Sequence, residues 1–303
     1  MKKQAEKKPT KIAWHVVFLK IILAIFLLEC GFVIFKIVSP RFISAFETPG
    51  SEMREIPPDV KKELSKTTSN NTATFYVPIL MYHYIEYVQD KKDTIRQSLN
   101  VNPNIFEQQI QTLQGAGYTF LTARQLGDIL DNKIAAPPKP ILLTFDDGHR
   151  DFYTNAFPLL KKYQVHATAY IIPGFTGGVD FMTQAQLQEV ATSGLVDIGA
   201  HTVHHIALKG RPYSAVSFEV GQSKAILERT YHISVVSFAY PGGSFDQQAI
   251  NSIKDAGFTT AVSTIPGEAQ SQKNRFFLFR LRPGSRTGKN LLSYLQNTRF
   301  KAN

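Results

Sequence analysis

From Phe75 onward, short runs of almost entirely apolar residues alternate with longer segments in which apolar positions recur every three or four residues. Short, β-branched runs are typical of buried strands, and the longer spacing is typical of amphipathic helices. The candidate strands are 77–84, 140–145, 166–172, 196–201, 234–240 and 258–264. The candidate helices are 102–117, 151–163, 183–194, 214–231 and 246–258.

This repeated strand-then-helix order predicts an α/β fold in which helices cover a parallel sheet. Several candidate strands are apolar at nearly every position, which indicates burial on both faces. The size of the chain suits a small closed (β/α) barrel of the TIM type with about seven parallel strands. In such barrels the functional residues lie at the carboxyl ends of the strands, so polar residues at those positions are the candidates for a site.

The N-terminal residues predict a membrane anchor. Five lysines within residues 1–15 precede a largely apolar stretch, which predicts a cytoplasmic tail and a transmembrane helix at 16–38. Lys20 and Glu29 interrupt this stretch, and a cleaved signal peptide that leaves a secreted protein is the alternative. Residues 39–74 are polar and predict a linker to a domain at 75–300. Because the lysines keep the N-terminal end inside, we expect this domain to lie outside the cell.

Charge and cysteine content narrow the possible partners. Residues 1–42 contain eight Lys or Arg and two Glu, so +6 of the net +10 belongs to the predicted membrane topology and +4 to the rest. No basic patch is interleaved with aromatic residues, so a nucleic-acid partner is not expected. The single cysteine, Cys30, excludes an intramolecular disulfide.

Two adjacent carboxylates, Asp146 and Asp147, end the candidate strand 140–145. Successive residues of a strand point to opposite faces, so the two side chains are expected to have different roles. Helix capping by one of the pair is an alternative, although Asp151, directly before the next candidate helix, is better placed for it.

The candidate strand 196–201 ends in HTVHH, in which His201 and His205 are four residues apart. If the turn continues as a helix, both imidazoles project from one face, and His204 lies off that face. A carboxylate from a neighbouring strand end would complete a set of two histidines and one carboxylate that can bind a metal and leave positions open. HxxxH at one strand end and DD at another together predict a metal site.

Two further strand ends carry candidate groups. Tyr240 begins the turn YPGG, whose backbone N–H groups are suited to an oxyanion hole, although a plain loop before the next helix is the alternative. His83 lies near the end of the first strand, and considered alone it is typical of a core histidine with a satisfied hydrogen bond.

Together TFDDG, HTVHH, FAYPGG and VPILMYHYI resemble the polysaccharide deacetylase family, the NodB-homology carbohydrate esterases, over residues 75–300. The segments VPILMYHYI and FFLFRLRPG are most similar to its branch of poly-N-acetylglucosamine deacetylases of the biofilm matrix. The resemblance implies a distorted (β/α) barrel, a divalent metal that is usually zinc, and removal of acetyl groups from N-acetylglucosamine in a polymer.

The resemblance also implies roles for individual residues. Asp146 would be the general base, and the N–H of Tyr240 would help to hold the oxyanion. His83 would protonate the departing amine, since the chain has no histidine after His232. The implied metal ligands are Asp147, His201 and His205.

Some positions depart from the family pattern. The third motif lacks its usual arginine, so Arg280 or Arg282 is a candidate to orient Asp146 instead. His149 stands where an aromatic residue is frequent, and it could line the cleft. The aromatic residues that could stack on sugar rings, or simply pack, are Tyr82, Tyr84, Phe175 and Phe181.

The expected function is metal-dependent N-deacetylation of an extracellular polysaccharide such as poly-β-1,6-N-acetylglucosamine. One alternative keeps the chemistry on peptidoglycan N-acetylglucosamine or on the O-acetyl groups of another polysaccharide. The alternative of another class is a non-catalytic, carbohydrate-binding surface protein, which would be favoured by loss of a base or ligand.

Overall fold

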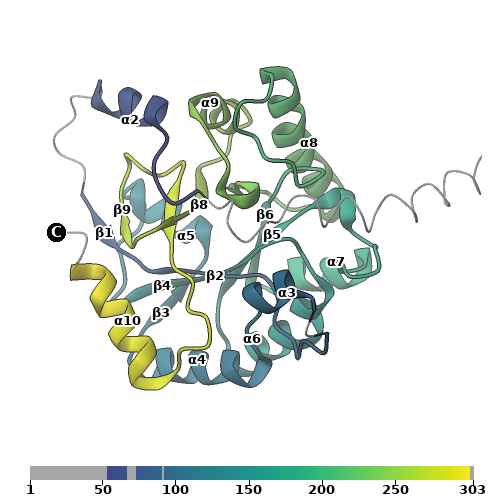
Figure 1. The fold of residues 1–303 in the computed structure, drawn as a ribbon, viewed down its shortest axis with the longest axis vertical. Helices are drawn as coiled ribbons and strands as arrows, with labels where there is room; N and C mark the ends of the chain where they lie inside the picture. Colours follow the sequence, from purple (N-terminus) through teal and green to yellow (C-terminus); the bar gives the residue numbers. More distant parts are fainter. Residues whose placement is uncertain (1–52, 67–72, 91, 301–303) are drawn as a thin grey trace, which may run out of the picture. The chain divides into compact units, whose positions relative to one another are not determined.

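Seven parallel strands form a nearly closed barrel, in the sheet order β10-β8-β7-β6-β5-β4-β2 (Figure 1). The structure is a computed structural model, and it describes residues 53–66, 73–90 and 92–300. A parallel bridge between Leu80 and Leu281 joins the two ends of the sheet. The strands are β2 Ile79–Tyr82, β4 Pro140–Phe145, β5 Ala167–Ile171, β6 Val196–Ala200, β7 Ser237–Ala239, β8 Thr260–Pro266 and β10 Leu278–Arg280. The expected barrel of about seven parallel strands is therefore confirmed.

The barrel strands form where the sequence is apolar on both faces. All residues of β2, β5 and β7 are buried, and β4 is buried from its second residue onward. The short strand β3 Thr119–Leu121 pairs with the first half of β4, beside the main order. Strands β1 Phe75–Tyr76 and β9 Ala269–Gln270 form a separate antiparallel pair. Burial on both faces explains why these runs do not alternate between apolar and polar residues.

Helices surround the barrel (Figure 1). Side-chain caps begin several of them: Thr122 and Thr183 each form a capping box, and Asp246 accepts a hydrogen bond from the Ala249 N–H. The helices are α2 Pro58–Ser65, α3 Thr94–Leu99, α4 Pro103–Gly115, α5 Ala123–Leu130, α6 Phe157–Tyr163, α7 Gln184–Thr192, α8 Tyr213–Tyr231, α9 Gln247–Asp255 and α10 Gly288–Phe300. A π-helical turn, η1 Phe152–Ala156, precedes α6, and short 3-10 turns η2 Pro173–Phe175 and η3 Pro241–Gly243 follow β5 and β7.

Part of the predicted linker 39–74 belongs to the folded unit, and for residues 53–66 that prediction is wrong. Val60 of α2 is buried in the main core, and Ile56 packs against it. The carboxylate of Asp59 accepts a hydrogen bond of 2.8 Å from the N–H of Gln247, at the start of α9. The physical reason is apolar spacing: Met53, Ile56, Val60 and Leu64 recur every three or four residues within an otherwise charged segment.

The predicted cytoplasmic tail 1–15 and transmembrane helix 16–38 lie outside the described residues. Within residues 53–66, 73–90 and 92–300, none of the helices combines the length and the apolar character needed to cross a membrane.

Candidate metal and catalytic site

The predicted site residues meet at the carboxyl end of the barrel. Asp146 and Asp147 directly follow β4, His201 directly follows β6, and His83 directly follows β2. Arg280 is the last residue of β10, the strand that completes the barrel next to β2. All of these side chains are buried or nearly so, and they project from different strand ends toward one another.

Asp147 is the centre of a cluster of imidazoles. Its Oδ1 lies 3.3 Å from Nε2 of His201 and 3.3 Å from Nε2 of His205. Within the described residues this buried oxygen makes no hydrogen bond of good geometry. The Asp147 backbone has φ of 75°, which is costly for a residue with a Cβ, and the following Gly148 continues the turn with φ of 81°.

The three side chains fit a divalent metal. Their candidate ligand atoms all lie within 4.8 Å of one another. Metal-to-ligand distances of about 2.0–2.1 Å and tetrahedral angles place neighbouring ligand atoms about 3.4 Å apart, which is close to the spacing of Oδ1 from the two imidazoles. A buried carboxylate oxygen without a hydrogen bond, facing two imidazole nitrogens, is the donor set expected of such a site. The predicted ligand set of Asp147, His201 and His205 is therefore brought together.

The loop that carries the two histidines is not a helix, so the expectation of helical spacing is wrong. Residues 201–208 have no regular structure, and Thr202 and His205 have positive φ values of 61° and 56°. Two left-handed residues turn the chain sharply enough to bring both imidazoles to Asp147. The i,i+4 spacing was correct in pointing to a pair, but its geometry comes from a strained loop.

Glu219 of α8 holds this loop through hydrogen bonds, and the sequence alone gave no signal for it. Its carboxylate is only 6% exposed and accepts hydrogen bonds from the N–H groups of Val203 (2.8 Å) and His204 (3.0 Å). Nδ1 of His204 lies 2.7 Å from its other oxygen. His204 is thus outside the clustered ligand set, and its pairing with Glu219 fixes the loop.

His201 is oriented by the neighbouring strand. Its Nδ1 lies 2.7 Å from the carbonyl oxygen of Ala239, at the end of β7. With Nδ1 donating to that carbonyl, the neutral imidazole has its lone pair on Nε2, which faces Asp147. This tautomer is the one that a metal ligand requires.

Burial and neighbouring charges act in opposite directions on the ionisable groups. Burial lowers the pKa of His205 to about 4, so this imidazole is neutral at physiological pH, as metal binding requires. Burial would raise the pKa of Asp147, but the imidazoles around it lower that pKa well below its ordinary value. Burial likewise opposes protonation of His201, yet Asp147 and Asp146 keep the pKa of His201 above its ordinary value.

Asp146 is paired with Arg280. Nη1 and Nη2 of the guanidinium each donate a hydrogen bond of 2.7 Å to one oxygen of the carboxylate, and Arg280 is only 1% exposed. Nε of Arg280 also donates to the Ser263 carbonyl oxygen at 2.7 Å, which fixes the plane of the guanidinium. We call the two parallel hydrogen bonds from Nη1 and Nη2 the Arg280 fork. Burial would raise the pKa of Asp146, but the charge and hydrogen bonds of Arg280 outweigh burial and hold that pKa below its ordinary value. Of the two arginines considered from sequence, Arg280 is thus the one paired with Asp146.

His83 lies beside the same carboxylate. Its Nε2 is 3.9 Å from Oδ2 of Asp146, and the residue is 8% exposed. Burial lowers the pKa of His83, partly offset by the two aspartates. Its Nδ1 is buried and makes no hydrogen bond to the described residues, so the alternative of a satisfied core histidine does not hold.

Tyr240 does not fit its predicted role. Its N–H donates a hydrogen bond of 3.3 Å to the carbonyl oxygen of Val262 in the neighbouring strand, so it is directed into the sheet. The side chain is fully buried, stacks on Phe245 and donates from its hydroxyl to the Phe276 carbonyl oxygen at 2.8 Å. The geometry counts against Tyr240 as the oxyanion donor and gives it a packing role.

Asp151 does not cap the following helix. Its carboxylate instead accepts a hydrogen bond from the N–H of Ile85, two residues beyond His83. Asn155 of η1 donates a hydrogen bond of 2.7 Å to the carbonyl oxygen of the same residue. Both polar groups of the Ile85 backbone are therefore held by the turn that follows the aspartate pair, and this fixes the segment that carries His83.

The aromatic residues proposed for sugar stacking are mostly occupied by packing. Tyr82 is buried, stacks on Phe145 and donates a hydrogen bond to Gln109. Tyr84 and Phe181 lie on the two faces of the His149 ring. Phe175 is partly exposed and packs against Phe181.

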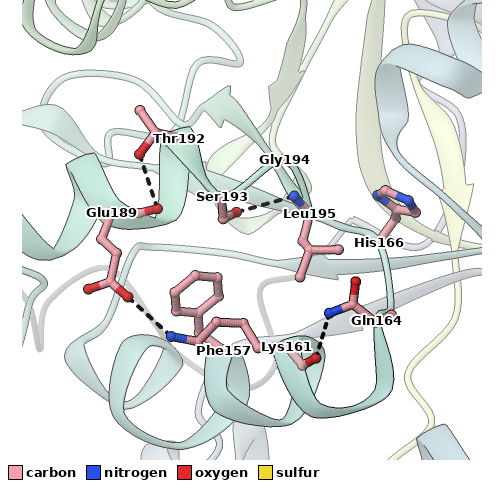
Figure 2. A pocket seen from close by; sticks show the side chains of 9 residues that line it. All are labelled: Phe157, Lys161, Gln164, His166, Glu189, Thr192, Ser193, Gly194 and Leu195. Atoms are coloured by element: carbon pink, nitrogen blue, oxygen red, sulfur yellow. Dashed lines mark hydrogen bonds and ion pairs between the residues drawn. The ribbon is translucent and has the colours of Figure 1, made fainter.

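A hollow elsewhere on the surface lies at the opposite end of the strands (Figure 2). It is lined by the segments that precede β5 and β6, including His166 and Leu195, and an ion pair of 3.1 Å between Lys161 and Glu189 crosses it. None of the predicted site residues lines it, so the strand-end cluster remains the candidate site.

Comparison with known proteins identifies the family. YxkH of Bacillus subtilis (strain 168), named as a candidate polysaccharide deacetylase, is 31% identical over 206 residues, which cover 68% of this chain and 71% of the relative. The chain belongs to the polysaccharide deacetylase family. The family model, described as polysaccharide deacetylase, matches residues 133–261, a range that contains Asp146, Asp147, His201 and His205.

Two proteins named as deacetylases are also similar to this chain. The deacetylase PplD of Streptococcus pyogenes, solved in complex with acetate, superimposes with a TM-score of 0.67 and 30% identity, over 75% of this chain and 99% of that one. The poly-beta-1,6-N-acetyl-D-glucosamine N-deacetylase of Staphylococcus aureus (strain MSSA476) is 24% identical over 212 residues, 66% of this chain and 72% of the relative. The family resemblance inferred from the four motifs is confirmed.

Proposed function

We propose that this member of the polysaccharide deacetylase family is a metal-dependent N-deacetylase that removes acetyl groups from N-acetylglucosamine in an extracellular polysaccharide, with poly-β-1,6-N-acetylglucosamine as the substrate. The single observation that carries the proposal is the division of labour within the aspartate pair. Oδ1 of Asp147 faces the two imidazoles of His201 and His205, whereas the neighbouring Asp146 faces Arg280 and His83. One carboxylate can therefore hold a metal while the other accepts a proton.

The residues that would hold the metal are Asp147, His201 and His205. A divalent ion such as Zn²⁺ bound there would polarise the acetyl carbonyl and lower the pKa of a water molecule. The surroundings prepare both histidines to bind a metal. Burial lowers the pKa of His205 and keeps it neutral, and the Ala239 carbonyl oxygen fixes the tautomer of His201.

Asp146 would accept the proton of the attacking water. Its lowered pKa keeps it ionised at neutral pH, and the Arg280 fork holds both of its oxygens in place. Because Arg280 is buried and also bonded to the Ser263 carbonyl oxygen, the carboxylate cannot rotate without breaking two charge-assisted hydrogen bonds. This pairing positions the base and offsets the free-energy cost of burying its charge.

His83 would then protonate the departing amine. Burial lowers its pKa, so it is neutral at the start of the cycle and must gain a proton before it can act as an acid. The carboxyl group of Asp146, 3.9 Å away, is the nearest group that gains one during hydrolysis. The proton taken from water would thus reach the amine by way of His83.

The choice of polymer is supported by two observations. The segments VPILMYHYI and FFLFRLRPG carry the resemblance to the poly-N-acetylglucosamine branch, and both contribute to this site, through His83 and Arg280. The Staphylococcus aureus relative named for this polymer is similar over about two thirds of the chain.

The N-terminal sequence supports a proposal for the cellular location of the reaction. We propose that the basic residues of 1–15 stay in the cytoplasm and that the apolar stretch 16–38 anchors the chain, with the barrel outside the cell. Such a position would expose the site to cell-surface polysaccharide and so fits a biofilm polymer as substrate.

Acetate release tests the proposed function. Zinc-loaded protein is assayed against β-1,6-linked and β-1,4-linked N-acetylglucosamine oligomers, peptidoglycan strands and an O-acetylated polysaccharide. The proposal expects the highest kcat/KM on the β-1,6 oligomers. Preference for peptidoglycan or for O-acetyl esters would replace the substrate and keep the chemistry, whereas no acetate from any of the four would exclude the catalytic proposal.

A further inference from the structure

A third imidazole contacts Asp147, on the side away from the two ligand histidines. Nε2 of His149 lies 3.3 Å from Oδ2 of Asp147, whereas His201 and His205 lie at the same distance from Oδ1. The two oxygens of one carboxylate thus have different partners. His149 is outside the set whose ligand atoms cluster within 4.8 Å, so it is not a fourth member of the metal site.

The ring of His149 is held between two aromatic rings. The centroid of Tyr84 is 4.1 Å away and that of Phe181 is 5.0 Å away, each at an interplanar angle of 26°. The guanidinium of Arg96 covers the outer face of Tyr84 at 4.7 Å, and Phe175 packs against Phe181 at 5.1 Å. We call Tyr84, His149 and Phe181 the aromatic clamp.

The backbone around His149 restricts the ring further. A bridge pairs His149 with Phe181, the N–H of Arg150 donates a hydrogen bond of 2.8 Å to the Asp180 carbonyl oxygen, and the N–H of Met182 donates one of 3.1 Å to the Gly148 carbonyl oxygen. His149 is 5% exposed, so its ring is nearly closed to solvent. The ring is therefore packed on both faces, with the edge that carries Nε2 beside Oδ2 of Asp147.

The residue in the middle of the aromatic clamp has a nitrogen that packing alone does not require. A phenyl ring would fill the same space between Tyr84 and Phe181, but it would place C–H groups against a buried carboxylate oxygen. Burial makes an unpaired carboxylate oxygen costly, so a nitrogen at this edge has an electrostatic consequence for Asp147.

We propose that His149 is a positioning residue that holds Oδ2 of Asp147 through Nε2, so that only Oδ1 is directed at the metal. The inference rests on the proposed metal site. A carboxylate held in this way binds through one oxygen and leaves the remaining positions of the metal for water and the acetyl group. The contact of 3.3 Å is longer than a tight charge-assisted hydrogen bond and lacks hydrogen-bond geometry, so the fixed position of the ring, and not bond strength, provides the restraint.

Zinc affinity, measured by competition with a chromophoric chelator, tests the proposal independently of activity. His149→Phe keeps an aromatic ring in the clamp and removes the nitrogen, and we expect its zinc affinity to fall about 10- to 100-fold, as for other residues that orient a metal ligand. His166→Phe, the same change at the opposite end of the strands, serves as the matched control and should bind zinc like the wild type.

A second pair of variants covers the case in which His149→Phe does not fold. His149→Gln and His149→Met have similar length, but only Gln offers an N–H near the position of Nε2. We expect Gln to bind zinc within about threefold of the wild type and Met to bind as weakly as Phe. Equal affinities for Gln and Met, or wild-type affinity in a folded His149→Phe, would overturn the positioning role.

Failure of the proposed function would be seen separately. A wild-type protein that does not bind zinc with one-to-one stoichiometry would overturn the metal site and this inference together. A wild type that binds zinc and releases acetate while all His149 variants bind zinc equally well would overturn this inference alone.

Discussion

The bidentate pair between Arg280 and Asp146 makes the sharpest mechanistic prediction. Arg280→Gln removes the charge and the fork while retaining a side chain that can still reach the Ser263 carbonyl oxygen. Two hydrogen bonds of 2.7 Å are lost from a carboxylate that is 3% exposed, so Asp146 becomes a buried charge without its cation. Breaking such a pair costs about 3–5 kcal/mol of unfolding free energy.

The effect on catalysis follows from the same geometry. Without Arg280, burial is left to raise the pKa of Asp146, and the carboxyl is no longer fixed in orientation. A positioned general base contributes about 10²- to 10⁴-fold to a rate, so we expect kcat/KM for acetate release to fall at least about 100-fold. Zinc affinity should stay within about threefold of the wild type, because Arg280 touches none of the three ligands.

Arg275→Gln is the matched control for this experiment. Arg275 donates a hydrogen bond of 2.5 Å to Asp131, and Asp131 directly follows α5 and so lies at the other end of the barrel. This variant should lose stability but keep kcat/KM. If Arg280→Gln is not folded, Arg280→Lys keeps the charge without the fork and should still lose activity. A folded, zinc-loaded Arg280→Gln protein with wild-type kcat/KM would refute the assignment of Asp146 as the base.

The remaining predictions concern the loop, the added helix and acid stability. Glu219→Ala leaves the N–H groups of Val203 and His204 unpaired, and it should weaken zinc binding about tenfold, as measured by chelator competition. Val60→Ala removes two buried methyl groups from α2 and should lower the urea unfolding free energy by about 2 kcal/mol; no change would show that α2 is not part of the folded core. Arg275 lowers the pKa of Asp131 from 3.8 to about 2, so this pair stabilises the fold above the ordinary pKa and loses that effect as pH falls through about 2. The stability difference between wild type and Asp131→Asn, on the order of 1 kcal/mol in urea titrations at neutral pH, should therefore vanish below about pH 2.

The barrel and the aspartate pair were predictable because both depend on local pattern. Apolar runs give the strands, and strand ends in a parallel barrel gather at one edge, so DD and HTVHH had to lie close together. The elements that the sequence did not predict are short or have a weak pattern of apolar residues. Strand β10 spans only three residues, and its pairing with β8 depends on a partner that is distant in sequence.

The rest of the site depends on tertiary contacts that no local pattern encodes. Glu219 lies on a helix, 14 residues beyond His205, and nothing in its surroundings marks it as the acceptor for the histidine loop. Tyr240 shows the opposite error: a strand-end turn suggested free N–H groups, but ladder pairing with Val262 extends one residue beyond β7. Residues 53–66 were assigned to a linker because charges conceal the spacing of the few apolar side chains.

The aspartate pair is assigned two roles, metal binding by Asp147 and proton transfer by Asp146, and a single variant separates them. Asp146→Asn keeps the shape of the side chain and leaves Asp147, His201 and His205 intact. Acetate release from β-1,6-linked N-acetylglucosamine oligomers is measured for wild type and variant at equal, analytically determined zinc content. We predict one zinc per chain in both proteins and a loss of at least about 100-fold in kcat/KM in the variant. Wild-type turnover by a fully zinc-loaded Asp146→Asn protein would rule out Asp146 as the proton acceptor.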